Sequence, residues 1–244
     1  MENSNLTPTD LPIIILPGFD GGTLLLEEFR TIASKSAPVS VVELPNCLDQ
    51  SYTTLVNSIL PHIAPSASYH LIAESFSGPL AILLAHRYPQ FFQRLTLVAT
   101  FATSPVPFFT AYFPARLLFR IPLPTLLARY FLMGFQANET LVMSLRYSMS
   151  KVPIEVLSAR LESLKSVDVR AELSSLQIPI EYIRPLQDRL VSNWQVEEVQ
   201  RTNNRVRVFQ LPGSHLILQT KPQEVWSLLQ SSHPPLKTFP LESY

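Results

Sequence analysis

Residues 69–80 read Tyr-His-Leu-Ile-Ala-Glu-Ser-Phe-Ser-Gly-Pro-Leu, and this is the most informative stretch of the chain. Its first five residues form an apolar run typical of a buried strand, and residues 80–86 have the composition of a helix. Between them, Ser75 has small residues two places away on each side, and Gly78 follows. A serine on such a turn has a strained backbone and lies beside a helix N-terminus, which favours an oxyanion. The stretch indicates a nucleophile, although a buried strand before a helix capped by Ser75 or Ser77 has the same pattern.

Five further apolar runs are typical of strands, and helical patterns lie between them. The strands are expected at 11–16, 39–44, 95–100, 178–183 and 205–210. The helices are expected at 24–34, 52–63, 79–87, 194–202 and 222–231. Near-continuous apolar strands that alternate with helices predict a mostly parallel sheet of about six strands, with helices on both faces. The ligand crevice of such an α/β sheet lies at the carboxyl ends of the strands.

Residues 103–171 interrupt this alternation and contain no convincing strand. The first half is crowded with prolines and aromatic residues, and the second half has helical spacing of apolar residues. We interpret the segment as a helical cap, or lid, inserted into a core of residues 1–102 and 172–244. An ordinary set of packing helices has the same pattern.

The turn after the first strand, Leu-Pro-Gly-Phe-Asp-Gly-Gly at 16–22, holds three of the six glycines in the chain. Such a turn lets backbone N–H groups point into the crevice. We expect the N–H groups of Phe19 and Phe76 to form the two-donor oxyanion hole that acyl transfer requires. The glycine spacing matches neither a phosphate-binding loop nor a dinucleotide-binding loop. A plain tight turn is the alternative.

Asp188 follows the fifth strand, and His215 follows the sixth. Alone, Asp188 also fits a solvated turn or a helix N-cap, and a lone histidine often has a structural role. A serine hydroxyl needs a histidine to remove its proton, and that histidine needs a carboxylate to orient it. The order Ser75, Asp188, His215 therefore makes His215 the expected base and Asp188 the orienting acid.

These segments, in this order, resemble those of the α/β hydrolases. The matched pieces, 16–19, 73–78, 188–191 and 213–215, span nearly the whole chain. The chain departs from the family in three ways: the elbow lacks both glycines, Pro17 stands where many members have histidine, and the two leading antiparallel strands are missing. The size and the cap are similar to those of serine carboxylesterases, including the small bacterial pimeloyl-carrier-protein methyl ester esterases.

The resemblance implies a serine hydrolase that cleaves a small carboxylic ester through an acyl-enzyme, without metal or organic cofactor. We expect an apolar acyl group, in a site lined by Gly18, Phe19, Phe76, Phe108, Phe109, Tyr112 and Phe113. One alternative is a thioesterase or a carrier-protein methyl ester esterase. The cap cations that could face an acyl carrier protein, or simply solvent, are Arg116, Arg120, Arg129, Arg146, Lys151, Arg160 and Lys165. A non-catalytic binding protein on the same fold is the other alternative.

Composition narrows the possible partners. Nineteen Lys and Arg residues balance 19 Asp and Glu residues, which argues against nucleic acid. One cysteine, Cys47, excludes an internal disulfide.

Residues 1–6 lack a signal-peptide pattern and no apolar run could span a bilayer, so we expect a cytoplasmic protein. Residues 117–135 are apolar with basic spacing, as in membrane-surface helices, although a lid packed on the sheet has the same pattern.

Overall fold

A six-stranded sheet forms the centre of the chain in the computed structural model, which describes residues 11–65, 67–105, 119 and 124–232. The strands are β1 (Ile13–Leu16), β2 (Val39–Val41), β3 (Tyr69–Glu74), β4 (Phe92–Val98), β5 (Ile180–Pro185) and β6 (Val206–Leu211). They pair in the order β2-β1-β3-β4-β5-β6, and every pair is parallel. The predicted sheet of about six parallel strands is confirmed.

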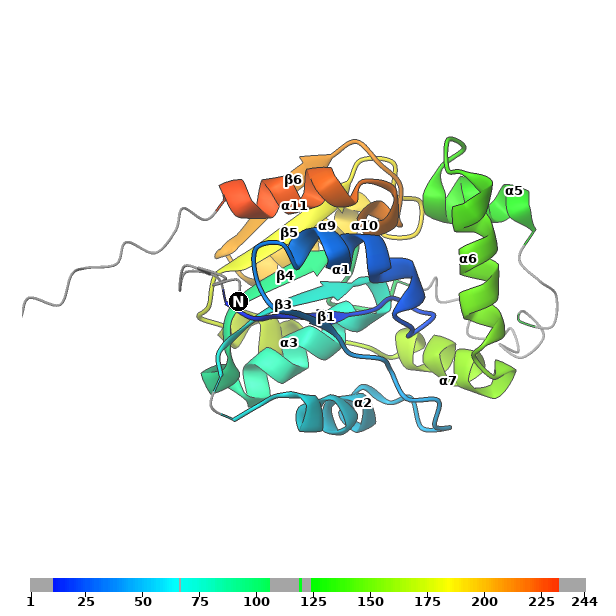
Figure 1. Cartoon of the computed structure of the whole chain (residues 1–244). Coiled ribbons are helices and arrows are strands. Elements are labelled where there is room, and N and C mark those ends of the chain that lie inside the picture. The colour runs from blue at the N-terminus through cyan, green and yellow to red at the C-terminus, as the bar shows by residue number, and fades with distance from the viewer. Residues whose placement is uncertain (1–10, 66, 106–118, 120–123, 233–244) are drawn as a thin grey trace, which may run out of the picture.

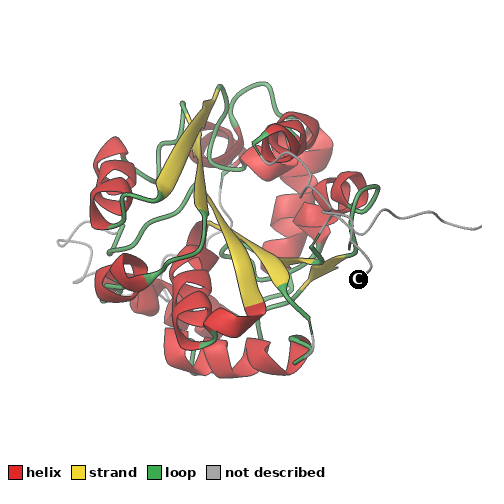
Figure 2. Cartoon of the chain, turned by 90° about the vertical axis from the view of Figure 1, so that its left-hand side faces the viewer, coloured by secondary structure: helices red, strands yellow, loops and turns green. Residues whose placement is uncertain are grey.

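Helices cover both faces of the sheet (Figures 1 and 2). One face packs against α1 (Glu27–Ala33), α10 (Ile217–Thr220) and α11 (Pro222–Ser231). The other face packs against α2 (Tyr52–Ile59), α3 (Gly78–Arg87), α8 (Arg170–Ser175) and α9 (Asn193–Thr202). Short 3-10 turns complete this core: η1 (Leu24–Leu26), η2 (Leu60–His62), η3 (Ser75–Ser77) and η4 (Pro89–Phe91).

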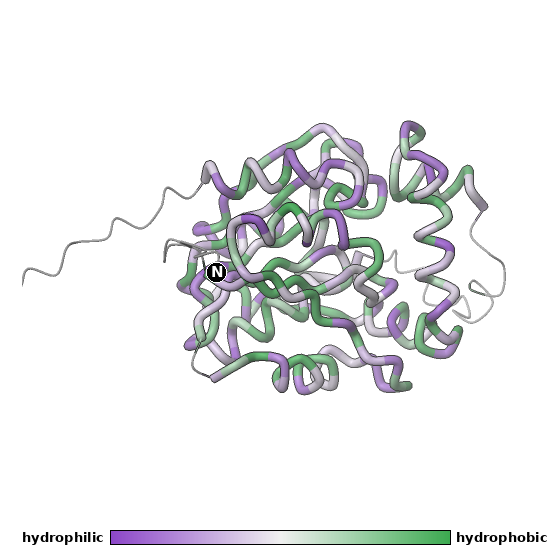
Figure 3. Tube along the Cα trace, in the orientation of Figure 1, coloured by the Kyte–Doolittle hydropathy of each residue, from purple (hydrophilic) through white to green (hydrophobic). Residues whose placement is uncertain are grey.

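The apolar runs explain this layering. In β1, Ile13 and Ile15 pack under α1 and α11, whereas Ile14 and Leu16 pack under α2 and α3. All four side chains are buried, because a parallel sheet with helices on both faces leaves neither face to solvent. Figure 3 shows the hydrophobic colour concentrated along the central strands, whereas polar and apolar residues alternate along the outer helices.

The strand order reverses at β1. That strand lies between β2 and β3, and the carboxyl ends of β1 and β3 meet with Leu16 opposite Ala73. Ligands of open α/β sheets bind at this kind of switch point. The turn that follows β1 and the serine that follows β3 are therefore neighbours.

A group of helices between β4 and β5 lies beyond the carboxyl ends of the strands, at the right of Figure 1. It contains α5 (Thr125–Ala128), the π-helical turn η6 (Arg129–Met133), α6 (Glu139–Ser150) and α7 (Ile154–Lys165), and we call it the cap. An isolated antiparallel bridge joins Thr103 to Asp168, so the chain leaves the core and returns to it side by side. The domain limits 103 and 171 stay predictions, and α8 already packs on α3 and α9 of the core.

None of the helices in the described part of the chain is long and apolar enough to cross a lipid bilayer.

Candidate active site

The turn predicted to be a nucleophile elbow, residues 73–78, is strained at the serine. Ser75 has a φ of 49°, in the left-handed region that a residue with a side chain rarely adopts. The side chain is partly exposed, although the residues on both sides are buried. No Cβ fits at Gly78, because it would overlap the side chain of Thr100 on β4's exit loop. Gly78, one place after the expected elbow position, is therefore the residue at which the packing requires a glycine.

Ser77 occupies the second of the two positions where the elbow pattern has a glycine, directly before Gly78, and it is fully buried. Its hydroxyl donates to the carbonyl oxygen of Pro17 at 2.5 Å. The elbow thus tolerates a serine because that side chain ties the elbow to the turn after β1.

The three residues predicted to form a triad come together at the carboxyl ends of the strands. His215 Nε2 lies 2.8 Å from Ser75 Oγ, and His215 Nδ1 lies 2.9 Å from Asp188 Oδ2. The side chains of His215 and Asp188 are each 4% exposed. Asp188 Oδ1 accepts the backbone N–H groups of Leu190 (2.8 Å) and Val191 (3.0 Å), so the local turn aims the carboxylate. We call Ser75, His215 and Asp188 the relay.

The surroundings of His215 favour its protonated form. Burial alone lowers the pKa of the imidazole, but the charge and hydrogen bond of Asp188 outweigh it, and the net pKa is raised. The charge of Glu74 also raises the pKa of His215, by a smaller amount. A base of this kind accepts a proton readily and is held as imidazolium by the adjacent carboxylate.

The two predicted oxyanion donors lie on neighbouring turns. The Gly18 carbonyl accepts the N–H of Gly21 at 3.0 Å, and the Ser75 carbonyl accepts the hydroxyl of Thr100 at 2.5 Å. In a trans peptide the N–H points opposite the carbonyl, so the N–H groups of Phe19 and Phe76 point away from these two bonds. Gly18 lies against the nucleophile, since a Cβ there would be 3.9 Å from Ser75 Cβ. The role of the Phe19 and Phe76 N–H groups as an oxyanion hole stays a prediction.

A second buried carboxyl lies beside the relay. Glu74 Oε2 accepts from Gln219 Nε2 at 3.0 Å, and both side chains are almost fully buried. Among the described residues, Glu74 Oε1 and Gln219 Oε1 have no hydrogen-bond partner. Burial raises the pKa of Glu74 to about 7, against opposing effects of Gln219 and His215. Both unpaired oxygens are acceptors, and a protonated Glu74 would carry a hydrogen-bond donor.

Aromatic rings surround the turn at Phe19. The Phe19 ring meets Phe76 edge-on with centroids 5.8 Å apart, and Phe119 stacks on Phe19 at 5.8 Å. Tyr52 stacks on Phe76 at 5.3 Å and donates its hydroxyl to the Phe76 carbonyl at 3.0 Å. Phe76 is therefore buried in the core, and Phe19 is partly exposed. The other predicted pocket residues, Phe108, Phe109, Tyr112 and Phe113, lie outside the described residues.

The cap contacts the loops that carry Asp188 and His215 and the turn after β1. Arg189, next to the relay's acid, donates to the Tyr130 carbonyl at 2.7 Å and lies over the Tyr130 ring. The N–H of Leu216, next to the relay's base, donates to the Leu132 carbonyl at 2.8 Å. Cap contacts with the turn after β1 come from α6 and α7.

The sequence-based interpretation of Arg160 is wrong. It was expected on a cap surface that faces a partner or solvent, but its side chain is completely buried. A signal was available, because Arg160 lies three residues after Leu157 and four before Leu164, on the buried stripe of α7. Hydrogen bonds of Arg160 reach Gln50 and the carbonyl of Phe19.

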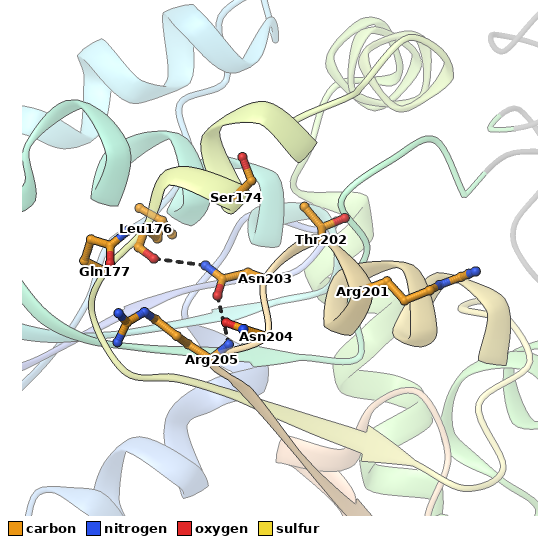
Figure 4. A pocket seen from close by; sticks show the side chains of 8 residues that line it. All are labelled: Ser174, Leu176, Gln177, Arg201, Thr202, Asn203, Asn204 and Arg205. Carbon is orange, nitrogen blue, oxygen red and sulfur yellow. Dashed lines mark hydrogen bonds between the residues drawn. The ribbon is translucent and has the colours of Figure 1, made fainter.

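A surface hollow elsewhere on the molecule is unrelated to the relay. It measures about 430 Å³ and lies at the amino ends of β5 and β6, opposite the relay. Asn203 spans it with hydrogen bonds to the carbonyl of Leu176 and the N–H of Arg205 (Figure 4). The carboxyl ends of α8 and α9 border this hollow. Across the described residues, no group of three or more His, Cys, Asp or Glu side chains could hold a metal ion.

Solved structures of several hydrolases are similar to this chain over most of its length. A carboxylesterase from Nitrososphaera gargenis matches with a TM-score of 0.76 and 15% identity, over 91% of this chain and 89% of that one. MGS-M2, an α/β hydrolase from a deep-sea metagenome, matches with a TM-score of 0.74 and 15% identity, over 96% and 94%. A thermophilic esterase from Thermogutta terrifontis matches with a TM-score of 0.78 and 18% identity, over 92% and 89%.

No protein-family model matches the sequence, and no curated protein matches it. Each match covers most of this chain and most of the matched chain at low sequence identity, so the matches establish the fold. The chain has the α/β-hydrolase fold.

Proposed function

We propose that this protein is a serine hydrolase that cleaves carboxylic esters with an apolar acyl group. The observation that carries the proposal is the relay, in which one imidazole bonds the Ser75 hydroxyl through Nε2 and the Asp188 carboxylate through Nδ1. This arrangement makes a hydroxyl nucleophilic near neutral pH. The similarity to a carboxylesterase and an esterase supports the same reaction class.

In the first half of the reaction, Ser75 Oγ attacks the ester carbonyl carbon and His215 Nε2 takes the hydroxyl proton. Asp188 holds the imidazole in the required tautomer and stabilises the imidazolium. The N–H groups of Phe19 and Phe76 receive the negative charge on the tetrahedral oxygen. His215 then gives its proton to the departing alkoxide, and the acyl group stays on Ser75.

In the second half, a water molecule replaces the alcohol. His215 takes a proton from the water as the oxygen attacks the acyl carbon, and the same N–H groups hold the second oxyanion. The tetrahedral intermediate collapses, Ser75 recovers its proton from His215, and the carboxylic acid leaves. The relay residues supply every proton transfer of the cycle.

The preference for an apolar acyl group follows from the rings near the nucleophile. Phe19 is partly exposed and stacks on Phe119 of the insertion, so an acyl chain would meet an aromatic face beside the turn. Apolar and aromatic side chains line most small-molecule sites. Esters with a charged acyl chain should therefore be poor substrates.

The carrier-protein alternative loses part of its support. Arg160 is buried, Arg129 pairs with Glu139, and Lys165 pairs with Glu162. Thioesters use the same relay, so a thioester belongs in the substrate panel. A small-molecule ester remains the substrate that we propose.

Replacement of the nucleophile tests the proposal. Ser75→Ala should lower kcat for p-nitrophenyl esters of graded acyl length by roughly 10⁴-fold or more and abolish labelling by a fluorophosphonate probe. Ser227→Ala, an exposed serine on α11, is the matched control and should keep both properties. Wild-type protein that is folded but neither hydrolyses esters nor reacts with the probe would instead support the non-catalytic binding protein.

A further inference from the structure

Arg160 extends from the cap helix α7 into the core beneath the turn after β1. Its side chain has no exposed surface, and its guanidinium donates to three acceptors. Nη1 lies 2.9 Å from the Phe19 carbonyl oxygen, Nε lies 3.0 Å from Gln50 Oε1, and Nη2 lies 3.3 Å from the Pro45 carbonyl oxygen. A buried cation is costly unless such partners satisfy it, so the cluster has one well-defined arrangement.

Asp20 supplies the opposite charge. Its carboxylate accepts the Ser148 hydroxyl from cap helix α6 and the backbone N–H of Gly22. Burial lowers the pKa of Arg160 to about 10, and the Asp20 charge opposes that shift. Arg160 therefore keeps its charge at neutral pH. Two cap helices thus hold consecutive residues of one turn, α7 through the Phe19 carbonyl and α6 through the Asp20 side chain.

The turn is shaped around the guanidinium. Gly21 has a φ of 70°, and a Cβ there would lie 2.6 Å from Arg160 Nη1. Only glycine accepts both the conformation and the contact. The Gly21 N–H closes the turn on the Gly18 carbonyl at 3.0 Å, and that carbonyl belongs to the peptide group whose N–H is that of Phe19.

We propose that Arg160 is a positioning residue, which fixes the turn 18–21 so that the Phe19 N–H points at the oxygen of the reacting ester. The guanidinium holds the peptide group after Phe19, and the turn hydrogen bond holds the peptide group before it. The cap then does more than cover the substrate, because it completes the catalytic geometry. This inference rests on the proposed ester hydrolysis.

A merely structural role predicts a different result from a positioning role. A residue that only joins α7 to the core would change stability and leave the chemical step alone. Donors of an oxyanion hole act in the transition state, so their displacement lowers kcat more than it changes KM. A misplacement of about 1 Å can cost about 100-fold in rate.

Kinetics of Arg160→Met and Arg160→Lys provide the test. We expect kcat of Arg160→Met to fall by roughly 10- to 100-fold, with KM within about 3-fold of wild type. Affinity for a trifluoromethyl ketone, which forms an oxyanion on the serine, should fall in parallel with kcat/KM. Arg160→Lys keeps a donor and a charge and should recover part of the loss.

Ser163→Ala is the matched control, because Ser163 lies on the same helix and donates to the backbone carbonyl of Gln50 at 2.7 Å. It should keep kcat within about 2-fold, since the turn 18–21 is untouched. If Arg160→Met does not fold, Ser148→Ala removes the other tether and should lower kcat by about 3- to 10-fold. Circular dichroism and thermal unfolding establish that each variant is folded.

The outcomes separate the two proposals. Folded Arg160→Met with wild-type kcat, or with unchanged ketone affinity, overturns the positioning role and leaves ester hydrolysis intact. A loss confined to KM also overturns it, because it indicates substrate binding. Wild-type protein that hydrolyses no ester overturns the proposed function and, with it, the role of Arg160.

Discussion

The relay lies at the carboxyl ends of the strands, and a second set of side chains inside the sheet has the same three kinds of functional group. His70 Nε2 lies 2.7 Å from Thr96 Oγ1, and Thr96 Oγ1 lies 3.4 Å from Glu181 Oε2. His70 and Glu181 each occupy the second position of a strand, β3 and β5. His70, Thr96 and Glu181, which we call the inner set, thus combine a hydroxyl, an imidazole and a carboxylate, as the relay does.

The two sets differ in order and in access. In the relay the imidazole is central and bonds the hydroxyl and the carboxylate, whereas in the inner set the hydroxyl is central. Thr96 has no exposed surface and lies within a strand, but Ser75 is partly exposed at a φ of 49°. The proposed reaction needs a central base and an accessible hydroxyl, and the inner set has neither.

Exchange of the two carboxylates for amides should give the largest contrast. Asp188→Asn should lower kcat by roughly 10⁴-fold, because the amide no longer holds the imidazole in its active tautomer. Glu181→Gln should keep kcat per folded molecule. Steady-state kinetics on one ester, with active sites counted by fluorophosphonate labelling, measures both. Equal losses in the two variants would contradict the distinction between the relay and the inner set.

The sequence predicted the relay because its members follow strands. Asp188 and His215 lie in loops at strand ends, and parallel strands bring such loops to one edge of the sheet. Arg160 and Glu74 were beyond this reasoning. A helical pattern shows that Arg160 lies on the buried face of α7, but it does not show which carbonyl 141 residues earlier the guanidinium meets. Long-range contacts of this kind depend on how the cap is placed on the core.

The same limit applies to the elbow. Small residues were expected around Ser75, and Gly78 was noted as displaced by one position. That Gly78 is required by the side chain of Thr100 on the next strand's exit follows only from the packed structure. The residues around Ser75 were enough to predict a nucleophile, but the space that its turn needs is set by residues far away in the sequence.

Thr96→Val should have a smaller effect, which acts on the stability of the protein and not on kcat. It removes the central hydroxyl of the inner set at nearly constant volume and leaves a hydrogen bond of His70 unmade. We expect a loss of about 1–3 kcal/mol in the free energy of unfolding and an unchanged kcat. Urea unfolding gives the first quantity and ester hydrolysis the second. Thr96→Ser keeps the hydroxyl and should lose less, whereas a fall in kcat at full stability would assign the inner set to catalysis.

Glu74→Gln should change stability by an amount that depends on pH. The folded-state pKa of Glu74, about 7, lies above its ordinary value near 4.5, so ionisation opposes folding. The stability contribution of the protonated carboxyl is complete below about pH 4.5, is lost as pH rises toward 7, and is constant above that. Relative to Glu74→Gln, wild type should therefore lose up to about 3 kcal/mol across this window, which unfolding at several pH values measures.

The same substitution tests the link between Glu74 and the relay. Ionised Glu74 helps to raise the pKa of His215, so its removal should lower that pKa. His215 must be neutral to accept the Ser75 proton, so the acid limb of kcat/KM should move to lower pH by less than about one unit. Glu181→Gln makes the same chemical change in the inner set and should leave the acid limb in place. An acid limb that moves to higher pH in Glu74→Gln, or by the same amount in both variants, would show that Glu74 does not act on the base.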